Sequence, residues 1–322
     1  MLGRRRLLVA TSCWPLLAAP AIAQGRWPAR PVRIIVPAPP GGGTDTLARL
    51  FAQHFQGVFG QPFVVENRAG GGGVIGSEAA ARAAADGYTL IVNFSGPITI
   101  LPHLQPVPYD PLRSFTPIYL PAVTPLLLVV PASSAIRTLS DALQAARGRQ
   151  GGLNLCNIGV GSPSHLVAEM FVRAFGVPMT GVPHRGSAPA LHDTVAGHCD
   201  LLFDSATSSL ALVQEGKLRA IATTGAQRME SLPEVPTMRE MGAPAIEAGT
   251  WSALFAPAGM ADEIVSALAE AAAALMRSEA QQARLRQLGS QFVDLRGEAL
   301  VQFIAAESVR WREVIRAADI RL

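Results

Sequence analysis

Short apolar runs alternate with amphipathic stretches along most of the 322-residue chain. The apolar run Val32–Val36 is mostly β-branched and is followed by prolines and three glycines. From Leu47 to Val58 apolar residues recur at helical spacing, and Gly60 stands where a helix commonly ends. The pattern therefore predicts a strand, a glycine-rich loop and a helix at residues 46–59.

The same alternation continues to the end of the chain. Further strands are predicted at residues 63–66, 88–94, 126–130, 153–157, 181–184, 200–203, 218–223 and 251–255. Further helices are predicted at residues 76–85, 139–148, 164–175, 187–196, 205–215, 261–276, 278–288 and 297–317. Strands that alternate with helices indicate an α/β fold built on parallel or mixed sheets.

Two changes along the chain indicate two lobes. A proline-rich stretch, residues 97–121, gives way to an apolar strand, and residues 242–250 form a second break before the last predicted strand. We expect a discontinuous first domain of residues 24–124 plus 243–322 and a second domain of residues 125–242. Paired crossovers of this kind are typical of a two-lobed protein that closes about a hinge.

Each lobe contains a glycine-rich loop before a helix. Residues 40–45 read Pro-Gly-Gly-Gly-Thr-Asp and residues 159–164 read Gly-Val-Gly-Ser-Pro-Ser, where Ser162 suits the N-cap position and Pro163 the first turn. Glycines allow several backbone amides to point into one space, and a helix N-terminus carries about half a positive charge. Both loops are therefore candidate anion sites beyond the carboxyl ends of strands.

Nucleotide-binding motifs are the main alternative for these glycines. A phosphate-binding loop needs a lysine after its last glycine, and the only lysine in the chain is Lys217. Gly71–Gly76 fits the dinucleotide pattern G-x-G-x-x-G, but residues 93–97, where a ribose-binding acid should stand, contain none. The chain also has no G-x-S-x-G or H-E-x-x-H motif, so we expect no enzyme and no catalytic residues. An exported α/β enzyme with a nucleotide loop stays the alternative from another functional class.

Three charged residues near predicted strand ends have two interpretations each. Arg185 either contacts a ligand or forms a surface ion pair. Asp204 either caps the helix that follows or hydrogen-bonds a ligand at the mouth of the site. Asp45 would be a like charge beside an anion, so we expect its carboxylate to turn back onto loop or helix amides; otherwise it holds an amino group of the ligand.

The N-terminus has the composition of a secretory signal peptide. Arg4–Arg6 precede an apolar stretch too short to span a membrane, and Ala21–Ala23 provide an A-x-A cleavage site. We expect residues 1–23 to be removed on export to the periplasm, by the general or the twin-arginine route. Removal lowers the formal net charge from +3 to zero, and the remaining arginines are scattered, so we expect a soluble protein that binds no nucleic acid.

Two cysteines, Cys156 and Cys199, remain after that cleavage, each within a strand-like run. In an oxidising compartment they could form a disulfide if the two strands are neighbours, and two buried free thiols are the other interpretation. A metal site with His165 and His198 lacks any usual ligand spacing. We expect no metal and no cofactor.

A series of motifs occurs in order over nearly the whole mature chain. They are VPAPPGGGTD at residues 36–45, VENRAGGG at 65–72, ADGYTL at 85–90, PYDP at 108–111, PHRGSAPA at 183–190, DLLFD at 200–204, GKLRA at 216–220 and LPEVPT at 232–237. Together they resemble the Bug-type solute-binding proteins of tripartite tricarboxylate transporters. The resemblance implies a type II-like periplasmic-binding-protein fold, with two parallel or mixed sheets flanked by helices and joined by hinge crossovers.

The resemblance also implies how the protein acts. It would be a monomer that closes on a small organic carboxylate (a di- or tricarboxylate, an amino acid or an aromatic acid), grips it mainly through main-chain amides and delivers it to membrane permease subunits. Presenting the ligand to a membrane sensor kinase is a related alternative. The residues expected to bind the ligand are Pro40, Gly41, Gly42, Gly43, Thr44, Asp45, Ser95, Gly96, Gly161, Ser162, Ser164, His165, His184, Arg185, Gly186, Ser187, Ala188 and Asp204.

Two positions depart from the family pattern. His184 stands where the family often has tyrosine, and residues 93–98 (Asn-Phe-Ser-Gly-Pro-Ile) lack the more usual polar, histidine-containing pattern. Both segments are expected to border the far end of the ligand, so the sequence defines the binding mode better than the substrate. A histidine there could make the affinity depend on pH, and an affinity that stays constant from about pH 5 to 8 would contradict that hypothesis.

Overall fold

The structure is a computed structural model that describes residues 27–321, so the predicted signal peptide lies outside the described residues. Its strands are β1 (Val32–Val36), β2 (Phe63–Asn67), β3 (Thr89–Phe94), β4 (Phe115–Pro131), β5 (Leu153–Asn157), β6 (Met179–Pro183), β7 (Leu201–Ser205), β8 (Leu218–Thr223), β9 (Gly249–Pro257) and β10 (Gln291–Leu295). Its α-helices are α1 (Gly43–Phe59), α2 (Val74–Ala81), α3 (Leu139–Gly148), α4 (Pro163–Phe175), α5 (Ser187–Val195), α6 (Ala206–Gln214), α7 (Asp262–Met276), α8 (Glu279–Gln287) and α9 (Gly297–Ala318). Three short irregular helices are η1 (Gly71–Gly73), η2 (Gly96–Ile100) and η3 (Leu101–His103).

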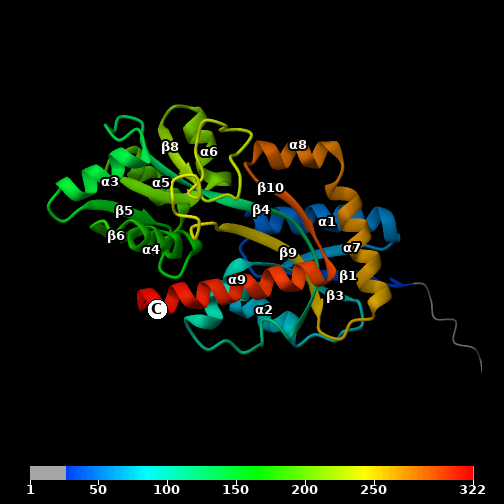
Figure 1. Ribbon diagram of the computed structural model, residues 1–322. Helices are drawn as coiled ribbons and strands as arrows, with labels where there is room; N and C mark the ends of the chain where they lie inside the picture. Colours follow the sequence, from blue (N-terminus) through cyan, green and yellow to red (C-terminus); the bar gives the residue numbers. More distant parts are fainter. Residues whose placement is uncertain (1–26, 322) are drawn as a thin grey trace, which may run out of the picture.

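The strands form two half-sheets that share β4, and Figure 1 shows the two α/β lobes built on them. In the first lobe the order is β2-β1-β3-β9-β4, with β1 parallel to β2 and β3, and β9 antiparallel to β3 and β4. In the second lobe β5 runs parallel to β6 and β7. Residues 115–125 of β4 pair with β9, and residues 126–131 pair antiparallel with β7 and β8. The predicted α/β fold with mixed sheets is confirmed.

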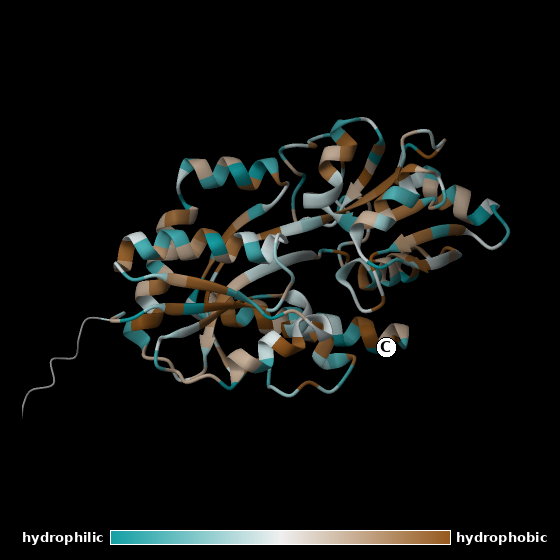
Figure 2. Cartoon of the chain, turned by 180° about the vertical axis from the view of Figure 1, so that it is seen from behind, coloured by the Kyte–Doolittle hydropathy of each residue, from teal (hydrophilic) through white to brown (hydrophobic). Residues whose placement is uncertain are grey.

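The cores of the two lobes are made of strand residues and the inner faces of helices. Figure 2 shows apolar residues concentrated in the strands, while the helices alternate between apolar and hydrophilic positions. The C-terminal helix α9 contributes to both cores: Leu300 and Ile304 pack in the first lobe, and Trp311 and Ile315 pack in the second. In Figure 1, α9 accordingly runs along one side of both lobes. Within residues 27–321, no helix has the length and apolar character that a membrane span requires.

Two chain segments cross between the lobes next to each other. One is β4 at Leu126, and the other leads into β9 at Ala248. Thr224 is fully buried between them, where its hydroxyl donates to the carbonyl of Ala248 at 2.6 Å and accepts from the amide of Leu126 at 2.9 Å. The crossings lie close to the two predicted breaks in the chain, and both the hinge and the domain boundaries at residues 124 and 243 stay predictions.

The structure adds elements within the proline-rich stretch, for which no element is predicted. Residues 97–121 contain most of η2, all of η3 and the first part of β4. The strand tolerates Pro117 because its pairing with β9 shifts register between Pro117 and Tyr119, so that the missing amide interrupts no regular ladder. β10 is also unpredicted, since its sequence QFVDL has no regular alternation of apolar and polar residues; all five residues are partly buried. The helix predicted to reach residue 85 ends at Ala81.

Candidate ligand-binding site

A cavity of about 790 Å³ lies between the two lobes. The start of α1, the end of β3 and the start of β9 line it from the first lobe, and the β5–α4 loop lines it from the second. The end of α7, α8 and the turn after α8 complete the wall. Of the residues predicted to bind the ligand, those at the cavity are Gly43, Thr44, Ser95, Gly96, Gly161 and Ser162.

The first-lobe loop presents an uncapped helix start to this cavity. Gly42 is the N-cap residue of α1 and has no capping side chain, so the first-turn amides receive no side-chain acceptor. Gly43 and Thr44 belong to this first turn and line the cavity. The hydroxyl of Thr44 lies 2.9 Å from that of Ser252 on β9, which also lines the cavity. We call this loop and the first turn of α1 the first jaw of the cavity, and the β5–α4 loop with the start of α4 the second jaw. The first jaw therefore offers backbone amides and hydroxyls together.

Asp45 holds the same loop in place without facing the cavity. Its buried carboxylate accepts the amide of Gly41, the side-chain amide of Asn67 and the guanidinium of Arg49, each at 2.9 Å. The hydrogen bond from Arg49 is the main cause that lowers the pKa of Asp45 to about 2, with smaller contributions from Gly41 and Asn67, against the opposing effect of burial. The expectation that this carboxylate turns back onto the loop is confirmed.

The second-lobe loop satisfies more of its own donors. The hydroxyl of Ser162 accepts the amide of His165 at 3.2 Å, as predicted for an N-cap residue, and donates to the carbonyl of Gly159 at 2.6 Å. The amide of Gly161 donates to Nδ1 of His165 at 3.2 Å. Burial lowers the pKa of His165, which favours the neutral ring that this acceptor role requires. Because Pro163 has no amide, this jaw offers fewer unpaired donors than the first.

The remaining predicted residues are outside the cavity lining. They are Pro40, Gly41, Gly42, Asp45, Ser164, His165, His184, Arg185, Gly186, Ser187, Ala188 and Asp204. The hydroxyl of Ser164 is buried and donates to the carbonyl of Phe203, so it anchors α4 to β7. Arg185, between β6 and α5, and Ala188, in the first turn of α5, are both exposed.

Asp204 is an internal link between helices. Its fully buried carboxylate accepts the hydroxyls of Ser187 at 2.8 Å and Ser208 at 2.6 Å, which ties the start of α5 to the first turn of α6. The N-cap residue of α6 is Ser205, so the N-cap interpretation of Asp204 is wrong. Burial raises the pKa of Asp204, and the two serine hydroxyls partly oppose that rise.

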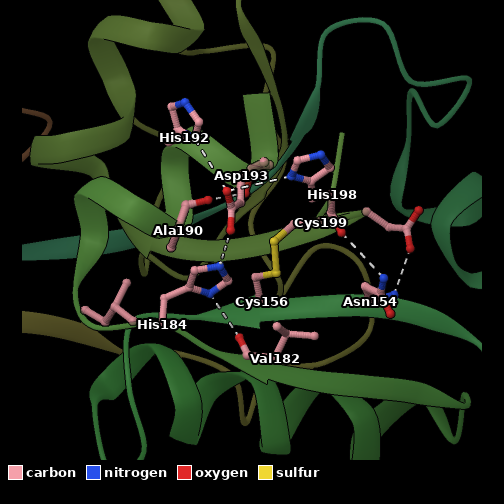
Figure 3. Close-up of a disulfide and its surroundings, with 12 residues drawn as sticks. Asn154, Cys156, Val182, His184, Ala190, His192, Asp193, His198 and Cys199 are labelled. Carbon is pink, nitrogen blue, oxygen red and sulfur yellow. Dashed lines mark hydrogen bonds and ion pairs between the residues drawn. A yellow bond between two sulfur atoms is a disulfide. The ribbon is translucent and has the colours of Figure 1, made fainter. Parts of the chain in front are cut away.

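The two cysteines form a disulfide behind the second jaw. Cys156 of β5 and Cys199 before β7 are bridged with their Cα atoms 5.9 Å apart, which confirms the disulfide interpretation over two free thiols. His184 lies beside this bridge, as Figure 3 shows, with Nε2 2.9 Å from a carboxylate oxygen of Asp193 and Nδ1 3.2 Å from the carbonyl of Val182. The ring of His184 thus contacts this cluster and not the cavity.

Sequence reasoning missed residues at the cavity that come from β9 and α8. Trp251 and Ser252 line it because β9 is antiparallel to β3, so the beginning of β9 lies at the edge where β3 ends, with Ser252 opposite Phe94. Ligand sites in parallel sheets are predicted at the carboxyl ends of strands, so residues at the beginning of an antiparallel strand are not considered. Leu285 and Leu288 had no signal in the sequence, since only tertiary packing brings α8 to the cavity.

Two α/β lobes joined by crossing strands, with helix N-termini facing one cavity, define the class of periplasmic solute-binding proteins. Residues 47–320 match the family described as "Tripartite tricarboxylate transporter family receptor". The chain belongs to this family. It is a solute-binding receptor and not an enzyme, so the interpretation as a nucleotide-dependent enzyme is wrong.

Relatives match over nearly the whole chain. Protein BugT of Bordetella pertussis is 35% identical over 308 residues, which cover 95% of this chain and 94% of BugT. A solved R. palustris protein with adipate is 36% identical with a TM-score of 0.80, over 92% of this chain and 99% of that one. MatC from Rhodopseudomonas palustris with bound malate is 33% identical with a TM-score of 0.74, over 90% of this chain and 100% of that one.

Proposed function

We propose that this protein is a periplasmic receptor that binds a small organic carboxylate between its lobes and delivers it to the membrane permease subunits of a tripartite tricarboxylate transporter. One observation carries the proposal: the uncapped first turn of α1 and the start of α4 line the same cavity between the lobes. Convergent amides at helix N-termini suit a carboxylate. Adipate and malate, which accompany two of the solved relatives, are both small carboxylates.

The difference between the jaws indicates where the carboxylate binds. The second loop uses the amide of Gly161 and the hydroxyl of Ser162 internally, whereas the first-turn amides of Gly43 and Thr44 have no side-chain cap. A hydrogen bond to a charged group contributes about 1.5–3 kcal/mol. A micromolar site needs about 8 kcal/mol. Amides of the α1 jaw, supported by the hydroxyls of Thr44 and Ser252, can supply much of that energy, so we place the carboxylate mainly on the first lobe.

The proposal extends to assembly and export. We propose that residues 1–23 are removed on export and that the mature protein acts as a monomer in the periplasm. Closure of the two lobes would exclude water from the carboxylate, and this exclusion strengthens its hydrogen bonds to the jaws.

Substitution at Gly43 tests the proposal directly. Gly43 is the first helical residue of α1, Gly42 before it is extended (φ −77°, ψ 171°), and an added Cβ at Gly43 meets nothing within 4 Å. Proline fits such a position, where its ring carbon Cδ replaces the hydrogen of the amide and no intrahelical hydrogen bond is lost. Gly43→Pro should weaken carboxylate binding by about 10- to 150-fold, from the loss of one charge-assisted bond. Isothermal titration with adipate and malate measures the effect.

Gly43→Ala is the matched control, because it adds a Cβ and keeps the amide. It should bind within about twofold of the unsubstituted protein, since open space surrounds the new methyl group. Equal affinities of the proline and alanine variants would contradict the assignment of the amide. Failure of every tested carboxylate to bind or to stabilise the unsubstituted protein would contradict the proposed function itself.

A further inference from the structure

Away from the two jaws, much of the cavity wall is hydrocarbon. Phe94 and Leu101 line it from the first lobe, and Leu285 and Leu288 line it from the region of α8. Among the described residues that line the cavity, Arg284 is the one charged side chain, and it is exposed. A ligand that carries several charges would therefore meet a single guanidinium outside the amide jaws.

Three glycines leave space for the side chains of Phe94 and Leu101, because a Cβ at any of the three would collide with one of them. A Cβ on Gly73 would lie 3.1 Å from Cζ of Phe94, and a Cβ on Gly96 would lie 2.9 Å from Cε2 of the same ring. A Cβ on Gly72 would lie 2.9 Å from Cδ1 of Leu101. Gly72 and Gly73, from the glycine run that fits a dinucleotide pattern in the sequence, thus pack against apolar side chains that line the cavity, and a side chain at either position would displace them.

Apolar side chains are also exposed at the cavity from both sides. Val160 on the second-lobe loop is 47% exposed and Leu288 after α8 is 37% exposed, and both line the cavity. Exposed apolar side chains that line a cavity are a typical feature of a ligand site, because covering them releases water at no cost in polar contacts. An apolar part of a ligand would cover these two side chains best.

We infer that the ligand is a carboxylic acid with a hydrocarbon body, aromatic or aliphatic, and that Phe94 and Leu101 determine this specificity. The inference rests on the proposed function, since the jaws must hold the carboxylate while the wall contacts the body. Hydroxylated or tribasic acids are disfavoured, because a hydroxyl or a second and third carboxylate against Phe94 and Leu101 would lose water without gaining a hydrogen bond.

A series of acids with one carboxylate and different bodies tests the inference. Titration calorimetry on the purified protein compares butyrate, pentanoate, hexanoate and benzoate with malate and citrate. The affinity should rise about fourfold for each methylene from butyrate to hexanoate, as expected for a CH₂ group buried from water. Benzoate and hexanoate should both bind more tightly than malate and citrate.

Substitutions in the apolar wall distinguish the contribution of the ligand's hydrocarbon body to the affinity from that of its carboxylate. Phe94→Asn should weaken hexanoate and benzoate by about tenfold and leave acetate, which lacks a body, unchanged. Leu288→Asn changes an exposed residue of the same wall that the fold does not need buried, and it should weaken hexanoate about threefold. Leu112→Asn is the matched control, since Leu112 is 51% exposed and outside the lining.

The outcomes distinguish this inference from the function on which it rests. Tighter binding of malate or citrate than of hexanoate and benzoate would overturn the hydrocarbon specificity while the carboxylate receptor stands. Equal weakening of acetate and hexanoate by Leu288→Asn, or no weakening of hexanoate, would overturn the role of the wall. No binding of any acid would overturn both.

Discussion

At the scale of single residues, Asp45 holds the loop before α1 in place from outside the cavity lining. Its carboxylate is occupied by Gly41, Arg49 and Asn67, so that its negative charge is satisfied inside the loop. The sequence predicts the inward turn of Asp45, because a free carboxylate beside a bound anion would repel it. The partner Asn67 is not predicted, because it stands at the end of β2 and reaches Asp45 only through the packing of β2 beside β1.

Replacing Asp45 should change both stability and its dependence on pH. The pKa of Asp45 is lowered from 3.8 to about 2 in the folded protein, so its contribution is present above about pH 4 and is lost as the pH falls towards 2. Asp45→Asn should lower the free energy of unfolding at pH 7 by about 1–3 kcal/mol, because a carboxylate with three donors loses its charge-assisted bonds. Urea unfolding followed by circular dichroism at pH values from 2 to 7 measures the change.

A surface acid provides the control for that experiment. Glu279 pairs with Arg286 but is 84% exposed, so Glu279→Gln should change stability by less than about 1 kcal/mol. The variant at position 45 should also show a shallower loss of stability than the unsubstituted protein between pH 4 and 2. Parallel pH profiles for the unsubstituted protein and the Asp45→Asn variant would contradict the lowered pKa of Asp45.

At the scale of secondary-structure elements, the second jaw depends on how β5 is anchored. Cys156 lies near the end of β5, directly before the loop that reaches the cavity at Ile158. The amide of His184 donates to the carbonyl of Asn157 and the amide of Gly186 donates to that of Ile158, so the segment directly after β6 supports the same loop. The resemblance implies that His184 and Gly186 contact the ligand; in the structure they support this loop and lie outside the cavity lining, and their contact with a ligand stays a prediction.

Removing the disulfide should destabilise the protein. The cysteines are 43 residues apart, and closing a loop of that length reduces the entropy of the unfolded chain by the equivalent of about 4 kcal/mol. The double substitution Cys156→Ser and Cys199→Ser should therefore lower the free energy of unfolding by up to about that amount. Urea unfolding with and without dithiothreitol measures it.

Dithiothreitol supplies its own control here, because the doubly substituted protein has no bridge to reduce. The reductant should shift the unfolding midpoint of the unsubstituted protein and leave that of the variant in place. An unsubstituted protein that unfolds identically with and without reductant would contradict the stabilising role of the bridge.

At the scale of the whole molecule, β4, the segment before β9 and α9 connect the lobes. Thr224 joins the first two, and α9 inserts Trp311 and Ile315 into the second core. We expect the lobes to pivot about these three connections. The cavity between the lobes is the space that such a pivot would close.

Ligand binding should therefore make the molecule more compact. Small-angle X-ray scattering of the purified protein should show a smaller radius of gyration with a saturating carboxylate than without one, because closure brings the lobes together over the ligand. The Gly43→Pro variant at the same ligand concentration is the control, since it should bind weakly and stay open. A radius that is the same with and without bound ligand would contradict closure.

The sequence by itself determined most elements and the two jaw loops of this protein. Hydrophobic periodicity, helix caps such as Ser162 and glycine loops before helices are local, since they depend on residues within a turn or two of each other. The predicted spans of β1, β5 and β8 agree with the structure for this reason. The disulfide stayed one of two interpretations, because pairing depends on which strands are neighbours.

Only the tertiary structure decided what faces the cavity. Ser252 and Leu288 come to it from beyond residue 250, while Thr44 comes from the first helix, and no local pattern connects positions so far apart. It also decided that Gly161 and Asp204 use their polar groups internally. The physical reason is that hydrogen bonds and apolar contacts across lobes are set by packing of the whole chain, which a periodic pattern cannot specify.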